Sequence, residues 1–494
     1  QERSWEDLYR NRWSYDKIVR STHGVNCTGS CSWNIHVKQG IVTWETQALD
    51  YPRFDPTIPP YEPRGCQRGV TASWYPYSPL RPKYPYIRRV LWDYYQEERQ
   101  RGKDPVEAWA SIVENEQRAK QYKSARGKAG WKRVSWDEAV ELVAGAQIYT
   151  IKKYGPDHVA NFAPIPAMSL VSFISGHRYN NLLGGIYCSY YEWYHDLPHV
   201  SSSMFGDQTE NCESSDWYHG TYWIVAGSNL NMTRTADCHF LPEAKYRGSK
   251  IVVVSPNYSD VAKYSDLWVP VVPGSDGAYF MACIHVILKE FYVDKETPYF
   301  TDYVKRYTNL PFLVVLDPDG KKYQMGRFLL ASDLADYAKE ENADWKLIMT
   351  DGGGKLHVPT GSIGFRWEKE PTGNWNLQLK NAVTKEDFDP LLTLLGKDQQ
   401  KAMVSFSDFT DTFSINMGRT EGKGQKAKEI LREVPARKVT TKDGKELLVT
   451  TAFDLLMAQA GVSRGLGGDY PRDYNDPKPY TPAWQESQTG VSRD

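Results

Sequence analysis

The chain of 494 residues contains only seven cysteines, which excludes a small disulfide-stapled scaffold. It also lacks a positive charge excess, since 60 Lys and Arg face 61 Asp and Glu, and this excludes the usual profile of a nucleic-acid-binding protein. No apolar run approaches 18 residues, so we expect no direct membrane span. The segment YFMACIHVIL instead predicts a buried helix.

Two further patterns are missing. The first residues carry no signal-peptide pattern, and a chain that begins with Gln1 fits a removed presequence or a fragment. No G-x-G-x-x-G motif is present, so ordinary NAD binding is not supported. Aromatic residues, in contrast, are abundant, with 17 Trp, 33 Tyr and 16 Phe, and they predict large packed interfaces or deep pockets.

One histidine and three cysteines near the start form the most informative pattern. They are spaced H-x3-C-x3-C-x34-C, at His23, Cys27, Cys31 and Cys66. A structural zinc usually takes its ligands in two close pairs, whereas a spaced triplet with a remote cysteine is common for a cubane iron–sulfur cluster. A 4Fe–4S cluster is therefore the leading interpretation, and zinc or no metal are the alternatives. Arg68 is placed to contact an anionic cofactor or to form an ordinary salt bridge.

The other four cysteines are scattered, and we expect them to be small buried apolar residues: Cys188, Cys212, Cys238 and Cys283. Residues 81–133 are locally basic, with 14 Lys or Arg against 7 Asp or Glu. This segment is either a solvated face or a docking surface for an acidic partner.

From Ser135 onward the pattern alternates between helices and apolar strands. Ser135 and Glu138 form a capping box that opens an amphipathic helix, with Val140, Val143, Ile148 and Ile151 on one face. A helix ending at Gly184 and the apolar strands YWIVAGSN, KIVVVSP and LWVPVV follow, with a helix from about Thr235 to Tyr246 between the first two strands and another from Asp276 to about Tyr292. The alternation predicts an α/β fold with a doubly wound parallel sheet. Recurring turn signals then predict a β-rich insertion.

Three polar loops follow the three apolar strands, in the segments AGSNLNMTRT, SPNYSD and VVPGSDGAY. Loops at the carboxyl ends of parallel strands are typical of ligand binding at a topological switch point, and helix N-termini there favour phosphate. The alternative is that their Asn and Ser residues only cap helices.

Asp196 lies in a loop rich in aromatic residues and just before Leu197-Pro198. It is either a metal ligand or, as is more common for such an aspartate, a helix cap or turn residue. His195 and His199 are expected to be polar loop residues.

In this order the segments resemble the catalytic (alpha) subunit of membrane-associated nitrate reductases and nitrite oxidoreductases, in the DMSO-reductase superfamily of molybdenum enzymes. The resemblance is carried by RSWEDLYRNRWSYDKIVRSTHGVNCTGSCSW, WETQALDYPR, EPRGC, YHDLP, ESSDWY, GSN, TDYVKRYT, GSIGFRW and YTPAWQ. It implies a multi-domain molybdopterin oxidoreductase fold with an iron–sulfur domain at 1–85, a dinucleotide domain at 86–310, the β-rich insertion at 311–450 and the start of a further domain at 451–494.

The resemblance also implies roles for single residues. His23, Cys27, Cys31 and Cys66 would hold a 4Fe–4S cluster, and Arg68 would lie between the cluster and a pterin. Asp196 would ligate molybdenum, and Asn26 with the aromatics before Asp196 would line the oxyanion pocket. One molybdopterin guanine dinucleotide of the molybdenum bis-molybdopterin guanine dinucleotide cofactor would contact Gly227, Ser228, Asn229, Ser255, Asn257, Gly274, Ser275 and Asp276.

The implied activity is interconversion of nitrite and nitrate by oxygen-atom transfer, with electrons passing through the cluster to an iron–sulfur beta subunit. A haem-containing gamma subunit is a further candidate partner, and the chain would be membrane-associated through its partners, on a face of the membrane that the sequence leaves open. Gln67, His195 and the motif GDQTE depart from the family pattern and put substrate and direction in question, with a lean toward nitrite oxidation. Because the family subunit is roughly twice as long, we expect an N-terminal fragment.

Three alternatives stay open. One is a related reductase of chlorate, perchlorate or selenate, and another is a non-catalytic iron–sulfur electron-transfer fragment. A third, weaker alternative is a binding module stabilised by zinc.

Overall fold

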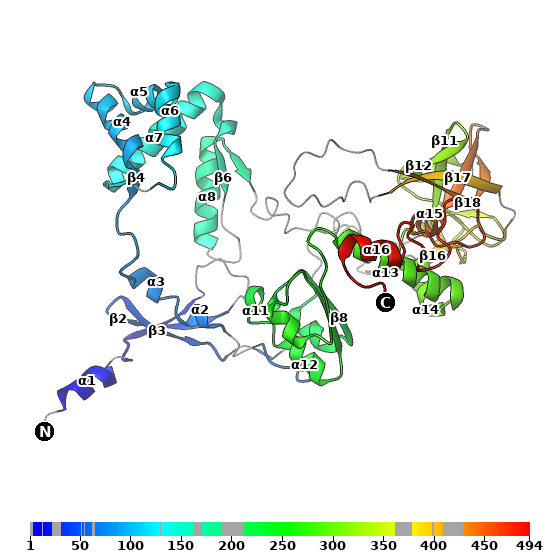
Figure 1. Cartoon of the computed structure of the whole chain (residues 1–494), viewed down its shortest axis with the longest axis horizontal. Coiled ribbons are helices and arrows are strands. Elements are labelled where there is room, and N and C mark those ends of the chain that lie inside the picture. Colours follow the sequence, from blue (N-terminus) through cyan, green and yellow to red (C-terminus); the bar gives the residue numbers. More distant parts are fainter. Residues whose placement is uncertain are drawn as a thin grey trace. The chain divides into compact units, whose positions relative to one another are not determined.

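The computed structural model describes residues 3–11, 13–21, 31–50, 52–53, 55–61, 65–128, 130–162, 170–188, 212–360, 378–397, 400–408 and 428–494 (Figure 1). The chain divides into two compact units, which are treated separately below. The first contains residues 1–253 and 258–267, and the second contains residues 254–257 and 268–494.

The first unit begins with a helix and a three-stranded antiparallel sheet of order β1-β2-β3. These elements are α1 (Ser4–Asn11), β1 (Lys17–Ser21), β2 (Trp33–Lys38) and β3 (Ile41–Gln47). The segments NIHV and IVTWE predict a hairpin with its turn at Gln39-Gly40. This prediction is confirmed, because Gln39 and Gly40 connect β2 to β3 with φ angles of 49° and 80°. Two short helices follow, α2 (Gln67–Val70) and α3 (Trp74–Tyr77).

A helical subdomain comes next, made of α4 (Arg89–Gln100), α5 (Pro105–Val113), α6 (Glu116–Ser124) and α7 (Trp136–Tyr154), with a ribbon of β4 (Tyr86–Arg88) and β5 (Trp131–Arg133). The predicted capping box is confirmed, since Ser135 and Glu138 bond reciprocally at the start of α7. The face of α7 with Val140 and Val143 is exposed, however, and Leu142 is buried instead. Gly145 explains this orientation, because α5 passes so close that an added Cβ would lie 2.7 Å from the carbonyl oxygen of Pro105.

Two sheets of α/β type follow. Strands β6 (Ala160–Phe162) and β7 (Ile186–Cys188) are parallel and are connected by α8 (Leu170–Leu183), which ends at Gly184 as predicted. The second sheet has the order β10-β9-β8, from β8 (Tyr222–Ala226), β9 (Lys250–Val254) and β10 (Leu267–Val269).

Strands β9 and β10 run in the same direction. The N–H of Asp266 donates to the carbonyl of Ile251, and further along both strands the N–H of Ser255 donates to the carbonyl of Val269. Between β8 and β9 lie α11 (Leu230–Thr233) and α12 (Phe240–Tyr246), so the predicted helix begins later than expected. The mixed α/β class is thus confirmed, while the iron–sulfur and dinucleotide domains stay predictions.

The second unit combines helices with a closed barrel. Helix α13 (Asp276–Ile287) continues as a π-helical turn to Asp294, and α14 (Pro298–Tyr307) follows. The barrel strands, in the order β11-β12-β17-β18-β19, are β11 (Leu313–Asp319), β12 (Lys322–Phe328), β17 (Gln400–Ser407), β18 (Glu429–Thr440) and β19 (Glu446–Thr451). Short pairs β13 (Met349–Thr350) with β14 (Leu356–His357), and β15 (Pro359–Thr360) with β16 (Gln378–Asn381), flank it.

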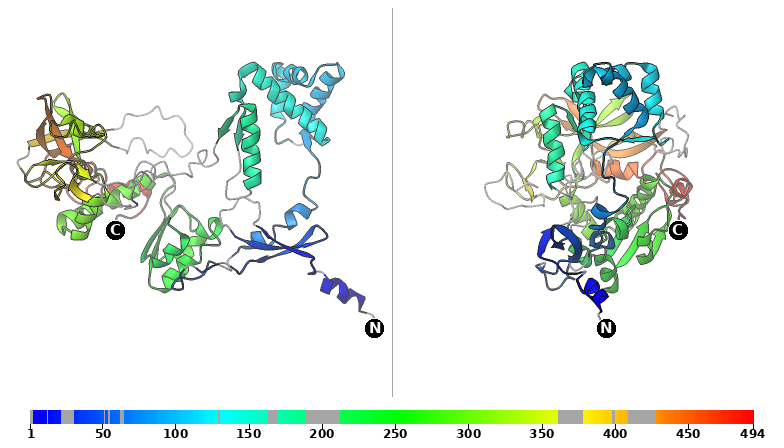
Figure 2. Two further views of the ribbon diagram at one scale, coloured as in Figure 1. Left: turned by 180° about the vertical axis from the view of Figure 1, so that it is seen from behind. Right: turned by 90° about the vertical axis from the view of Figure 1, so that its left-hand side faces the viewer.

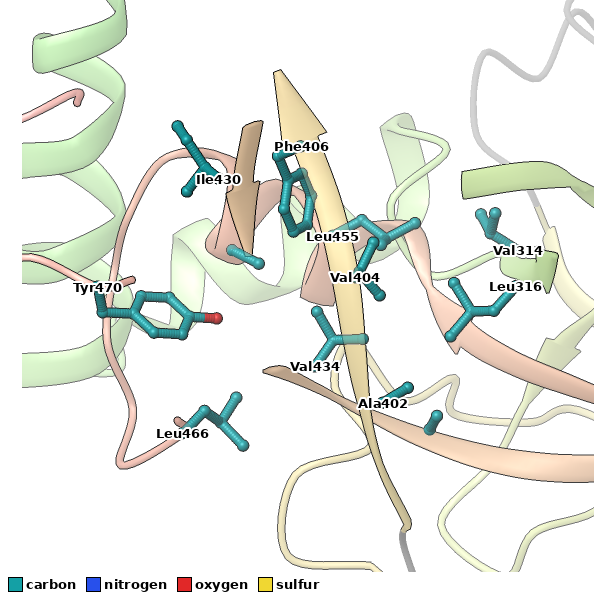
Figure 3. Packing of buried hydrophobic residues seen from close by; sticks show 12 residues of the cluster. Val314, Leu316, Ala402, Val404, Phe406, Ile430, Val434, Leu455, Leu466 and Tyr470 are labelled. Atoms are coloured by element: carbon teal, nitrogen blue, oxygen red, sulfur yellow. The ribbon is translucent and has the colours of Figure 1, made fainter. Parts of the chain in front are cut away.

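Apolar side chains fill the barrel from several strands (Figure 3). Val404 and Phe406 of β17 face Val434 of β18, and Leu466 and Tyr470 close the cluster from the segment after α15 (Ala452–Gln459). The chain then reaches α16 (Pro482–Thr489), which lies beside α13 (Figure 2). The predicted boundaries at 85, 310 and 450 stay predictions.

Candidate functional site

Cys31 and Cys66 both lie next to the open end of the β2–β3 hairpin. Cys31 is 5% exposed and comes two residues before Trp33, which pairs with Gln47 at the end of β3. Cys66 precedes α2, and α2 packs on β3. The two cysteines, 35 positions apart, are therefore held by the same end of one hairpin.

Gly65 makes this approach possible. A Cβ added at Gly65 would lie 1.9 Å from Oε1 of Gln47 and 2.6 Å from the ring of Trp33. The amide of Gln47 also donates to the carbonyl of Ser32 at 2.9 Å, directly beside Cys31. Only a residue without a side chain fits here, so the backbone before Cys66 lies flat against the strands that carry Cys31.

A buried carboxylate fixes the segment after Cys66. Glu45 of β3 is 5% exposed and accepts from the N–H of Ser73 at 2.6 Å and from its hydroxyl at 2.8 Å. These bonds hold the start of α3 on the sheet. Sequence reasoning missed this pair, because an acidic residue in a strand and a distant serine carry no signal that they meet.

The other predicted metal ligands, His23, Cys27 and Asp196, lie outside the described residues, as do the predicted pocket residue Asn26 and the loop residue His195. Among the residues that the structure describes, no group of three or more His, Cys, Asp or Glu residues could hold a metal. The choice between a cluster, zinc and no metal stays a prediction. Arg68 lies in α2 and is exposed.

The remaining cysteines differ from the expectation. Of the four, only Cys238 is buried; Cys188 and Cys283 are half-buried and Cys212 is exposed. Burial raises the thiol pKa of both Cys238 and Cys283, so neither is set up as a reactive thiolate at neutral pH.

The loop after β8 is open toward solvent. Gly227 adopts a φ of 66° with nothing within 4 Å of its Cβ position and is exposed, whereas Ser228 is half-buried. Asn229 has a structural task, because its Oδ1 accepts from the N–H of Val261 at 3.3 Å. The exposed Gly227 is therefore the most open part of this loop, with the half-buried Ser228 beside it.

In the loop after β9, Ser255 is internally satisfied. Its hydroxyl donates to the carbonyl of Asn257 at 2.8 Å, and the indole N–H of Trp268 donates to its carbonyl at 3.1 Å and its hydroxyl at 3.2 Å. Ser255 is 6% exposed, whereas Asn257 is exposed. Ser255 thus shapes the loop, and Asn257 presents the polar group.

The loop after β10 shows the same division. Ser275 is 2% exposed, and both its N–H (3.1 Å) and its hydroxyl (2.6 Å) donate to the carbonyl of Val272. Gly274 has a φ of 82° and open space around it. Asp276, the first residue of α13, is exposed.

The end of α16 supports this third loop. The N–H of Val272 donates to the carbonyl of Thr489 at 2.9 Å, and the Thr489 hydroxyl donates to Gln485 at 2.7 Å. Thr489 and Gln485 are 0% and 4% exposed, so the contact is a fixed part of the interior. Ala278 of α13 also packs with Tyr480 and Trp484. Nothing in the sequence indicates that α16 supports a loop more than 200 residues earlier.

Comparisons with known proteins show which family the chain belongs to. The family model described as "Molybdopterin oxidoreductase" matches residues 81–445. The chain therefore belongs to the molybdopterin oxidoreductase family.

Several relatives are more specific. The chain is 48% identical over 99% of its length to the respiratory nitrate reductase 1 alpha chain of Escherichia coli. It is 47% identical over 100% of its length to the nitrate reductase alpha chain of Bacillus subtilis, and 49% identical over 99% of its length to the nitrate reductase alpha subunit of Mycobacterium tuberculosis. The chain spans 38–39% of the length of these three relatives.

Within the part of the chain that the structure describes, no helix is both long and apolar enough to cross a membrane.

Proposed function

We propose that this chain is part of the catalytic subunit of a molybdenum enzyme that interconverts nitrite and nitrate by oxygen-atom transfer. One observation carries the proposal: identity of 47–49% extends over essentially the whole chain to proteins named nitrate reductase alpha chains or subunits. The hairpin that brings Cys31 close to the Cys66 segment supports it, because these are two of the four residues that the resemblance assigns to an iron–sulfur cluster.

His23, Cys27, Cys31 and Cys66 would hold a 4Fe–4S cluster in this enzyme. The fit rests on Gly65, which lets two described ligands converge on one hairpin end without a clash. A histidine in place of one thiolate removes a negative charge from the cluster's ligands and raises its reduction potential. Arg68, exposed beside Cys66, would stand between the cluster and a pterin.

Asp196 would ligate molybdenum, and Asn26 would help to line the oxyanion pocket. When bound, the molybdenum cofactor supplies the two-electron oxygen-transfer chemistry, and the protein supplies position and electrostatics. A hard carboxylate ligand suits a high-valent metal that transfers oxygen.

The loop geometry assigns different tasks to the dinucleotide residues. Ser255, Ser275 and Asn229 would hold the loops in shape through bonds they already make. The groups left to contact phosphate, ribose or base would be the half-buried Ser228 and four residues that are exposed: Gly227, Asn257, Gly274 and Asp276. Backbone N–H groups at the start of α13 suit a phosphate.

Electrons would pass through the cluster to an iron–sulfur beta subunit, with a haem-containing gamma subunit as a further partner. Membrane association would come through these partners. Direction and substrate follow from potentials and from pocket residues, and Gln67 and His195 are the candidates that would favour nitrite oxidation or another oxyanion such as chlorate, perchlorate or selenate.

The test is an oxyanion activity panel on the complete subunit with its beta partner. We expect nitrite oxidation or nitrate reduction to exceed activity on chlorate or selenate. Asp196→Ala should abolish activity with iron content intact, whereas Cys31→Ala should lose the cluster. Four irons without molybdenum in the purified protein would instead favour the non-catalytic electron carrier, and a lone zinc would favour a binding module.

A further inference from the structure

The basic segment 81–133 contains two kinds of cation. Arg99, Arg101, Lys103 and Arg118 all form ion pairs inside the helical subdomain. Arg101, Lys103 and Arg118 reach Glu98 at 2.7, 2.5 and 2.8 Å. These bonds lower the pKa of Glu98 to about 2, with the bond to Lys103 the largest cause. The positive charge of these four residues is therefore neutralised within the fold.

A second group of cations in the segment forms no such ion pairs. From Gln117 to Trp136 the sequence contains no Asp or Glu but seven Lys and Arg. Apart from Arg118, these cations are exposed and form no ion pair with any residue in the part of the chain that the structure describes: Lys120, Lys123, Arg126, Lys128, Lys132 and Arg133. Like charges this close together repel one another unless an external anion neutralises them.

The β4–β5 ribbon joins this basic run to exposed aromatics. Register pairs Tyr86 with Arg133 and Arg88 with Trp131, so these four share one face of the ribbon, because side chains alternate along a strand. Ile87, on the other face, packs against the helical core. Tyr86 and Trp131 are 49% and 57% exposed.

The ribbon and α6 form one surface rather than two. The Arg88 guanidinium donates to the carbonyl of Tyr122 in α6 at 3.1 Å, and the N–H of Arg89 donates to the carbonyl of Gly130. The guanidinium of Arg133 lies 3.7 Å from the centre of the Tyr84 ring. Figure 1 shows β4 beside the helices α4 to α7.

We propose that this surface, the basic-aromatic face, docks an acidic surface of the iron–sulfur partner subunit; the identity of that partner rests on the function proposed above. The basic-aromatic face consists of Tyr86, Arg88, Lys120, Lys123, Arg126, Lys128, Trp131 and Arg133. Trp, Tyr and Arg are the residues that most often dominate protein–protein binding energy. A nucleic acid fits less well, because the chain as a whole has a net charge of −1.

The experiment reverses the charge of the face in the full-length complex. Lys120→Glu, Lys123→Glu, Arg126→Glu and Lys128→Glu are combined, and affinity for the purified beta subunit is measured by interferometry at low and physiological ionic strength. We expect the dissociation constant to rise at least about tenfold and its salt dependence to flatten, because rim charges set steering and salt response. Trp131→Ala, which keeps the charge, should weaken binding by about fivefold or more.

The matched control applies the same charge change elsewhere, with Lys321→Glu, Lys339→Glu, Lys397→Glu and Lys442→Glu, which are exposed in the second unit. Circular dichroism checks that each variant is folded. An unchanged affinity in the folded reversal variant, or an equal loss in the control, overturns the proposal. The proposal is also overturned if charge reversal weakens only binding to phosphatidylserine vesicles, which would assign the face to a lipid surface. The same holds if charge reversal weakens only self-association.

The outcome is separable from the proposed activity. If the wild-type complex forms, loses affinity on charge reversal and yet converts no oxyanion, the function fails and the docking surface stands. If the wild-type complex converts nitrate or nitrite while charge reversal leaves the affinity unchanged, the docking surface fails and the function stands.

Discussion

The barrel of the second unit and the cysteine hairpin of the first are both antiparallel β-structure, yet they are stabilised in different ways. The barrel leaves no unpaired edge, and its largest cluster contains twelve buried residues. Among the residues that the structure describes, the hairpin cluster contains three, Cys31, Trp33 and Ala236, and all five residues of its edge strand β1 are exposed. Since edges and small cores leave a sheet marginal, the proposed cluster would stabilise the hairpin, whereas the barrel is closed by its own strands.

Arg432 shows how self-contained the barrel region is. It is 0% exposed and donates only to backbone carbonyls, those of Ala458, Gln459, Asp469 and Pro479. Burial lowers its pKa, but four carbonyls and the ring of Tyr470 hold the guanidinium in place. One side chain thereby joins β18 to α15 and to the segment before α16.

The largest effect is expected from Arg432→Met. The substitution removes the buried guanidinium that donates to the carbonyls of Ala458, Gln459, Asp469 and Pro479, which should cost about 3–5 kcal/mol of the free energy of unfolding. Urea denaturation followed by tryptophan fluorescence measures it. Lys438→Met, on the same strand but exposed and paired with Glu446, should cost about 0–1 kcal/mol. Equal losses in the two variants would show that the Arg432 bonds add nothing.

The hairpin should respond through the proposed cluster at its end rather than through its packing. Gly65→Ala places a methyl group 2.6 Å from the ring of Trp33, so the backbone that carries Cys66 must move away. We expect the iron content of the full-length protein to fall to about half or less, because ligands must lie close to their ideal positions. Iron analysis and the visible absorption of the cluster measure this.

The control for that variant is Gly352→Ala, where nothing lies within 4 Å of the new methyl group. It should leave iron content unchanged. A Gly65→Ala protein with full iron would show that the hairpin end is adaptable, and the contrast with the barrel would then disappear.

Local patterns in the sequence predicted a good part of both regions. Neighbouring residues determine three of these features: the Gln39-Gly40 turn, the capping box at Ser135 and the helix end at Gly184. Turn-forming glycines and side-chain caps act within a few positions along the chain, so a local pattern predicts them. Closure of the barrel was not predictable, since it pairs β11 with β19 across more than 100 residues and sets β12 parallel to β17.

The candidate site was likewise only partly predictable from the sequence. The ligand spacing named Cys31 and Cys66, but only the structure places Gly65 against Trp33. The loops after β9 and β10 were predicted as polar, but nothing in their composition says that Ser255 and Ser275 are occupied by their own backbone while Asn257 is not. Apolar periodicity also chose the wrong face of α7 for burial, because Gly145 allows α5 to pack on the opposite face.

The helical subdomain is intermediate, since an ion network supports its small core. The folded-state pKa of Glu98 lies at about 2, below the ordinary value of 4.5, so its contribution is complete above pH 4.5 and is lost as pH falls toward 2. Glu98→Gln should therefore reduce the loss of urea stability between about pH 5 and pH 2. Glu114→Gln, at an exposed pair with Lys153, should change that pH dependence less. Equal slopes in wild type and Glu98→Gln would contradict the assignment.

The smallest effect is expected in the loop after β9, which is neither packed like the barrel nor part of the proposed cluster site. Trp268→Phe keeps an aromatic ring but removes the N–H that donates to Ser255. Loss of about 1 kcal/mol should weaken binding of guanosine diphosphate, a probe for the dinucleotide, about fivefold in calorimetric titration. Trp345→Phe, at a site that is 81% exposed, is the control and should have no effect. If Trp268→Phe binds as tightly as wild type, the loop is shaped by Ser255 and Asn257 alone, and the indole bond serves only the packing of β10.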